Sequence, residues 1–290
     1  MVSAHGRREA VRDLLCTHEA ALAELRAAMS SDALFNPMVH DDLWLLRYVL
    51  SHAKKGGVAS ALAAARACMA WRHRHNMDDP LLPCGGAAAL AMPAVAKMYT
   101  ALRDPAAISY YVPDPDRGTL FVSVPALIDF HKAAATVTEE EQSLAHRLTT
   151  EWLWRQCDEV TRRTGLLTKC VRLVDLKSMG LSNIPWELVR RDASNSKVTE
   201  DFYPQLLGAV FVCNAPALIN VVWRGLRPVL PARILEKVDF LGTSARERAR
   251  LLRWVAAEHL PERYGGSCKV WPPPNARFAL ARQSTDAESI

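Results

Sequence analysis

Residues 207–213, with the sequence LGAVFVC, form the stretch that most directly decides the fold class. Every residue in it is small or apolar, so both faces of an extended strand would avoid water. Such a strand is typical of the interior of a parallel sheet that helices cover on both sides. One face could instead line a cavity, although the pattern alone favours an ordinary core strand.

Segments with strand and helix patterns alternate around this stretch. Further strands are predicted at 108–112, 119–124, 169–176 and 235–241, and helices at 138–163, 184–199, 216–227 and 244–257. Two of these helices begin with a capping box, Thr138 with Glu141 and Ser244 with Glu247. A turn rich in Pro and Asp at 113–118 predicts a hairpin between the first two strands. The sequence therefore predicts an α/β fold with a mostly parallel sheet covered by helices.

The N-terminal part of the chain shows only helical patterns. Apolar residues recur at helical spacing through 11–29, 43–50, 58–72 and 87–102. The pair Gly56 and Gly57 suits a C-terminal cap for the second of these helices. We therefore expect a helical module at 1–85, an α/β domain at 86–272 and a flexible tail at 273–290.

Composition excludes several classes of protein. Of the 290 residues, 50% are hydrophobic and 23% are charged, which excludes a wholly disordered chain. The net charge of +5 is too small to indicate nucleic-acid binding, but it permits attraction to an anionic membrane. The longest apolar stretch, 208–223, is interrupted by Asn214 and Pro216, and the N-terminus lacks a signal-peptide pattern. Seven cysteines without a C-x-x-C motif favour a reduced cytosolic protein without a zinc site.

The common catalytic motifs are missing from the sequence. It contains no G-x-S-x-G, no G-x-x-x-x-G-K-[ST], no G-x-G-x-x-G and no H-E-x-x-H. His73 and His75 are two residues apart and would point away from each other on a helix, which disfavours a metal site. Cys170 on a buried strand is typical of an inert core thiol. We therefore expect a protein that is not an enzyme and that holds no metal.

Eight motifs follow one another along the chain. They are DLWLLRY at 42–48, MAWR at 69–72, VDLKSMGLS at 174–182, FYP at 202–204, NAP at 214–216, RPVL at 227–230, FLG at 240–242 and LPERYGG at 260–266. In order and spacing, this set resembles the CRAL-TRIO family from about residue 40 to residue 268. The resemblance implies an N-terminal helical module, then a sheet and helices that enclose a hydrophobic pocket with a gating helix.

The same resemblance implies a function without catalysis. Members of the family enclose one hydrophobic lipid and carry it between membranes or present it to an enzyme. We expect a phospholipid such as phosphatidylinositol, no cofactor besides the bound lipid, and a monomer in the cytoplasm that associates peripherally with membranes. The alternatives are a scaffold that transfers no lipid and a carrier of another hydrophobic ligand, such as a sterol, a tocopherol-like molecule or haem.

Two positions match the family's phosphatidylinositol site. Lys237, ten residues after Arg227, corresponds to a lysine that helps to hold the inositol phosphate. Gln205 stands where the phosphatidylinositol binders have a glutamate after Tyr-Pro. A glutamine can bond a hydroxyl group but carries no charge, so the match is incomplete.

The family's phosphatidylcholine site matches less well. Cys170 and Arg172 stand where the family has Ser and Thr, while Tyr111 matches one headgroup tyrosine and Phe121 replaces another. Two alternatives stay open for Arg172. If it points inward, it is a buried cation that needs an anion from a lipid phosphate, a carboxylate ligand, Asp175 or Glu151. If the register differs by one residue, it forms an outward salt bridge.

The helix at 216–227 corresponds to the family's gating helix. Its apolar face carries Leu218, Ile219, Val222, Trp223 and Leu226, and it would open toward a bilayer. The alternative is a helix that is simply packed on the sheet. Further pocket residues are predicted at Phe202, Tyr203 and Phe211. Arg246, Arg250 and Arg253 share a helix face and are predicted to contact anionic lipid, although such a face is more often merely solvated.

Overall fold

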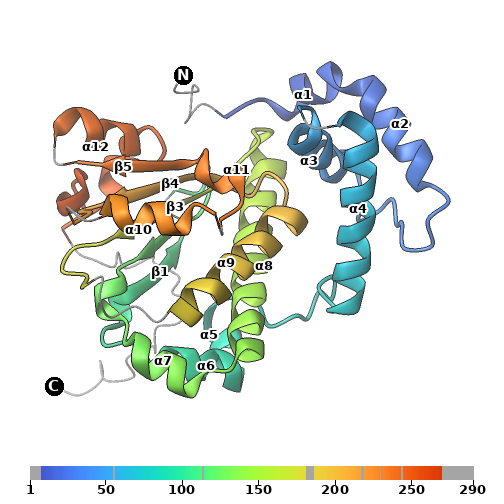
Figure 1. Cartoon of the computed structure of the whole chain (residues 1–290). Helices are drawn as coiled ribbons and strands as arrows, with labels where there is room; N and C mark the ends of the chain where they lie inside the picture. Colours follow the sequence, from blue (N-terminus) through green and yellow to red (C-terminus); the bar gives the residue numbers. More distant parts are fainter. Residues whose placement is uncertain are drawn as a thin grey trace, which may run out of the picture.

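The centre of the protein is a five-stranded sheet with the order β1-β2-β3-β4-β5 (Figure 1). The computed structural model describes residues 8–269, apart from 55, 113, 181–185, 217–218, 229 and 243. The strands are β1 (Ile108–Tyr111), β2 (Leu120–Ser123), β3 (Cys170–Asp175), β4 (Leu207–Cys213) and β5 (Val238–Leu241). β1 pairs antiparallel with β2, and all other pairs are parallel. The predicted α/β fold and the predicted hairpin are therefore confirmed.

Helices precede, cover and follow this sheet (Figure 1). Those of the N-terminal part are α1 (Val11–Thr17), α2 (Glu19–Met29), α3 (Asp42–His52), α4 (Gly57–Arg74), α5 (Gly86–Leu90) and α6 (Pro93–Tyr99). Those of the remaining chain are α7 (Phe130–Thr136), α8 (Glu139–Thr164), α9 (Trp186–Phe202), α10 (Ile219–Leu226), α11 (Ala232–Leu235) and α12 (Ala245–Leu252). Among them, none has the length and apolar character needed to cross a bilayer.

Both predicted capping boxes are present. Thr138 caps α8 with Glu141, and Ser244 caps α12 with Glu247, so each pair satisfies backbone N–H groups that the first helical turn leaves free. The first predicted helix is interrupted at His18, which separates α1 from α2.

The role predicted for the paired glycines was wrong. α3 ends at His52, whereas Gly56 is the N-cap of α4 with a φ of 91°. A Cβ atom at Gly56 would collide with the Oγ of Ser60, so close packing also favours glycine there. The glycines therefore begin a helix instead of ending one.

The two faces of the sheet pack against different elements. On the outer face, alternate strand residues meet α12 and the segment after it in one buried cluster that includes Val171, Leu173, Phe211 and Leu251. On the inner face, Tyr110 packs with α8, while Val210 and Val212 pack with Ile219 of α10. The inner face is therefore the side on which the helical cover could enclose a ligand.

The helical module and the α/β domain share one hydrophobic core. A single buried cluster joins residues of α2, α3 and α4 to α8, to the first residue of β3 and to the chain after α9. Across this junction the rings of Trp71 and Phe202 stack at 4.7 Å, and Arg47 forms an ion pair with Asp158 at 3.0 Å. The boundary predicted near residue 85 therefore stays a prediction, because the packing is continuous across it.

Candidate functional site

One row of residues crosses the inner face of all five strands. The register aligns Tyr110 with Phe121, Phe121 with Arg172, Arg172 with Val210, and Val210 with Val238. Residues aligned across a sheet project to the same side, so Arg172 shares its face with two aromatic and two aliphatic neighbours. This register settles the orientation of Arg172, which points inward.

The inner face is packed less completely than the outer face. In β3, the outer-face residues Val171 and Leu173 are buried, whereas the inner-face residues Arg172 and Val174 are only half-buried. Phe121 of β2 and Phe240 of β5 are half-buried as well. Some side chains of the inner face therefore keep accessible surface, while Tyr110, Val210 and Val212 on the same face are buried.

Aromatic rings form a column along one end of this row. The rings of Tyr110 and Phe121 stack at 4.5 Å, and Tyr110 meets Trp152 of α8 edge-on at 6.3 Å. The guanidinium of Arg172 lies over Phe121, 4.8 Å from the ring centre. Such a contact stabilises a cation but does not neutralise its charge.

Polar side chains of α8 and α9 lie near this column. The Nε2 of His146 is 2.8 Å from the hydroxyl of Thr199 and 3.3 Å from that of Thr150. Burial, together with the nearby positive charge of Arg172, lowers the pKa of His146 to about 4, against the opposing effect of Asp192. His146 is therefore neutral at pH 7 and forms hydrogen bonds with the hydroxyl groups of Thr199 and Thr150.

The helix predicted as a lid is present as α10 and packs on the sheet, so its opening stays a prediction. Trp223 meets Phe240 of β5 edge-on at 5.2 Å, and Ile219 packs on Val210 and Val212. Leu218 lies outside the described residues, as do the side chains of Val222 and Leu226.

The two residues predicted for an inositol phosphate already have protein partners. The Nζ of Lys237 is 2.8 Å from a carboxylate oxygen of Glu200, and the side chain of Gln205 donates to the hydroxyl of Ser51 at 3.0 Å. A lipid phosphate would therefore have to replace Glu200 at Lys237.

Two predicted site residues lie on the opposite face of the sheet from Arg172. Tyr111 donates from its hydroxyl to the carbonyl of His259, and Phe211 packs in the outer-face cluster. The physical reason is strand alternation, which sends neighbouring residues to opposite sides. The structure therefore does not bring Tyr111 or Phe211 together with Arg172, and Tyr110 takes the inner position instead.

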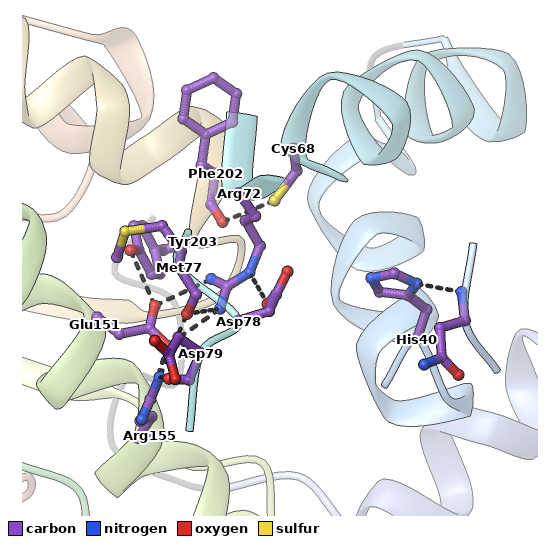
Figure 2. A network of polar contacts seen from close by, with 11 residues as sticks. His40, Cys68, Arg72, Met77, Asp78, Asp79, Glu151, Arg155, Phe202 and Tyr203 are labelled. Carbon is purple, nitrogen blue, oxygen red and sulfur yellow. Dashed lines mark hydrogen bonds and ion pairs between the residues drawn. The ribbon is translucent and has the colours of Figure 1, made fainter. Parts of the chain in front are cut away.

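Phe202 and Tyr203 lie at the junction of the module with the domain, in the same hydrophobic cluster as Tyr110 and Phe121. Figure 2 shows the polar network there, which is centred on Glu151 of α8. Its carboxylate accepts from Arg72 at 3.0 and 3.1 Å, from Arg155 at 2.9 Å and from Tyr203 at 3.0 Å. Through this network, Glu151 of α8 holds Arg72 of α4 by an ion pair, so the network connects the two helices.

Cys170 is buried at the start of β3. It belongs to the cluster that also contains Tyr110 and Trp154. Burial raises the pKa of its thiol, which keeps it protonated and unreactive at neutral pH.

The three arginines predicted for membrane contact have different surroundings. Arg246 and Arg253 are exposed, whereas Arg250 is half-buried, forms an ion pair with Asp239 at 3.0 Å and donates to the carbonyl of Phe240. Arg250 therefore ties α12 to β5, and the exposed basic face is smaller than the spacing predicts.

A groove of about 440 Å³ lies between α9 and the residues that follow α10. Its lining residues are Arg190, Ala193, Ser194, Lys197, Asp201, Leu230 and Pro231. None of the lipid-site residues predicted from the sequence lines this groove. Within the described part of the chain, no cluster of three or more His, Cys, Asp or Glu side chains is placed to hold a metal ion.

Comparison with known proteins agrees with this architecture. A model of the CRAL/TRIO domain matches residues 106–266. The SEC14 cytosolic factor of Eremothecium gossypii is 26% identical over 268 residues, which cover 89% of this chain and 79% of that protein. The phosphatidylinositol/phosphatidylcholine transfer protein SFH11 of Arabidopsis thaliana is 30% identical over 96 residues, which cover 33% of this chain and 25% of that one.

A solved structure shares the fold. The crystal structure of Sfh5 matches with a TM-score of 0.57 at 11% identity, covering 89% of this chain and 88% of that one. The fold is that of an α/β domain that follows a helical module. With more than half of its length matched by the domain model, the chain belongs to the CRAL/TRIO family.

Proposed function

We propose that this protein binds one lipid between the inner face of its sheet and the covering helices, and carries it between membranes. The observation that supports the proposal is the half-buried, largely apolar inner face beneath α10 in a CRAL/TRIO chain. The names of relatives support transfer of a phospholipid, since one is a phosphatidylinositol/phosphatidylcholine transfer protein. The lipid leaves chemically unchanged.

In this proposal α10 opens at the membrane. Its contact with the sheet includes the edge-on pair Trp223 and Phe240, and Trp is a side chain that favours the bilayer interface. Release of this pair onto a bilayer would expose the row below it. Arg246 and Arg253 are available for anionic lipid, at about 1 kcal/mol for each basic residue near a charged surface.

The expected cargo is a phospholipid such as phosphatidylinositol. Lys237 and Gln205 would then leave Glu200 and Ser51 to hold the headgroup. A sterol or a tocopherol-like molecule keeps the transfer role without that exchange of partners.

Native mass spectrometry of the full chain, followed by organic extraction and lipid identification, tests the proposal. We expect one lipid for each chain, and transfer of that lipid between vesicles at a rate proportional to protein concentration. If phosphatidylinositol is the cargo, Lys237→Ala should lose it while Arg74→Ala, on the exposed end of α4, keeps it. A chain that neither carries nor takes up lipid would instead be a scaffold.

A further inference from the structure

Arg172 occupies the centre of an otherwise uncharged row. Its neighbours across the sheet are Phe121 on one side and Val210 on the other, and the row ends in Tyr110 and Val238. A guanidinium in the middle of a helix-covered sheet loses much of its hydration, and this loss is costly unless an anion compensates it.

The protein itself does not supply that anion. Within the described part of the chain, no carboxylate lies within ion-pair distance of Arg172, and its buried Nε has no hydrogen-bond partner. Asp192 of α9 influences His146 and Tyr110 nearby, but it is exposed and does not pair with Arg172.

Both protein anions suggested by the sequence are engaged elsewhere. Asp175 accepts from Asn214 at 2.8 Å and from the hydroxyl of Tyr264 at 2.7 Å. Glu151 accepts from Arg72, Arg155 and Tyr203. Each carboxylate therefore already has its hydrogen-bond donors.

We propose that Arg172 binds the acidic group of the carried lipid, a carboxylate or a phosphate, on the inner face of the sheet. The ring of Phe121 supports one plane of the guanidinium, which leaves its N–H edge for two anionic oxygens. This inference rests on the proposed function and names the chemistry that the site selects.

The hydrocarbon part of such a lipid has an apolar surface beside the anchor. Val210 and Val238 continue the row from Arg172 and belong to the cluster under Ile219 of α10. An amphipathic molecule could therefore place its acid at Arg172 and its chain beneath the lid. His146 and Thr199 offer neutral polar groups near the acid end.

The test compares acids with neutral lipids of the same chain length. The purified full chain is incubated with vesicles that contain equal amounts of palmitic acid and hexadecanol, or of phosphatidic acid and diacylglycerol with matched acyl chains. The bound lipid is then extracted and quantified. We expect the wild type to prefer the acid about tenfold or more in at least one pair, the ratio that one lost charge-assisted bond produces.

The variants decide whether Arg172 causes this preference. Arg172→Leu should bring the two members of the preferred pair to within about threefold, while Arg172→Lys keeps part of the preference and Arg74→Leu keeps all of it. The pair in which the preference occurs distinguishes a fatty acid from a phospholipid. Equal uptake of acids and neutral lipids by the wild type overturns the anion site but leaves lipid transfer intact, and uptake of neither overturns the proposed function. The wild-type ratio needs no variant to fold.

Discussion

Arg72 is buried and Arg172 is half-buried, and the groups around the two side chains differ. Arg72 donates to the buried carboxylate of Glu151, to Asp78 at 2.6 Å and to the carbonyl of Met77 at 3.1 Å. Arg172 has a ring beneath it and a buried N–H without a partner. Arg47 and Arg250 also have a buried N–H without a partner, but each pairs with a carboxylate. A cation paired with a carboxylate is a structural part of the fold, whereas a cation without an anion in the interior indicates a site that something else completes.

The charges around Arg72 also affect its titration. Although burial opposes it, the charge and hydrogen bonds of Glu151 raise the pKa of Arg72. The cation is therefore held in its charged state by the module junction itself.

The largest effect is expected from Glu151→Leu. The substitution leaves Arg72 without its buried anion and removes the partner of Arg155 and Tyr203, so the free energy of unfolding should fall by about 3–5 kcal/mol. Urea unfolding of the full chain measures it. The matched control is Asp78→Asn, which removes the exposed carboxylate that pairs with Arg72. It should lower the free energy of unfolding by about 1 kcal/mol or less. Equal losses of stability in the two variants would contradict the conclusion that the buried Glu151 is the main structural partner of Arg72.

A second prediction compares the two faces of β3. Leu173 is fully buried on the outer face, and Leu173→Ala should lower the free energy of unfolding by about 2–5 kcal/mol. Val174, two residues after Arg172 on the inner face, is only half-buried, and Val174→Ala should lower the free energy of unfolding by about 1 kcal/mol. If Val174→Ala costs as much as Leu173→Ala, the inner face is as tightly packed as the outer one.

Much of the scaffold follows from local patterns. The apolar stretch of β4 and the capping boxes at Thr138 and Ser244 depend on residues close in sequence, and the structure contains all three. The difference between Tyr110 and Tyr111 could not be obtained in this way. Two adjacent tyrosines fit either phase of a strand, and only the pairing of Tyr110 with Phe121 shows which one faces inward.

Contacts between distant residues account for the other differences. Lys237 pairs with Glu200 of α9, and β4, α10 and α11 lie between these two residues in the sequence. Nothing in the sequence near Lys237 indicates that partner. Phe211 lies in a strand that is apolar on both faces, so its pattern does not reveal a side. Arg172 is the informative exception, because the sequence indicated that an inward orientation would need an anion, and the register shows that orientation.

The titration of His146 tests how well water is excluded near Arg172. Burial lowers the pKa of His146 from its ordinary 6.5 to about 4, so between these values the unfolded chain binds a proton that the folded chain does not. Stability is therefore lost as the pH falls below 6.5, by at most about 1.4 kcal/mol per pH unit for one site. His40, His52 and His75 are shifted in the same direction and add to the wild-type slope.

His146→Gln isolates the contribution of that residue. The amide can still bond the hydroxyl of Thr199 but does not titrate. Thermal unfolding of wild type and variant between pH 7 and pH 5 should therefore show a shallower pH dependence in the variant. The same pH dependence of Tm in wild type and variant would mean that the pKa of His146 is not lowered and that water reaches the surroundings of Arg172.

The smallest effect on stability is expected at Arg172 itself. Because no protein anion is stranded when its charge is removed, Arg172→Leu in lipid-free protein should change the free energy of unfolding by about 1 kcal/mol or less, in contrast to Glu151→Leu. The ligand reverses this ranking. A lipid that binds only the folded state raises stability by an amount that grows with its concentration relative to Kd. The preferred acid should therefore raise the Tm of the wild type and of Arg74→Leu, but not that of Arg172→Leu. A large loss of stability in lipid-free Arg172→Leu would show that the guanidinium is a structural part of the fold, as that of Arg72 is.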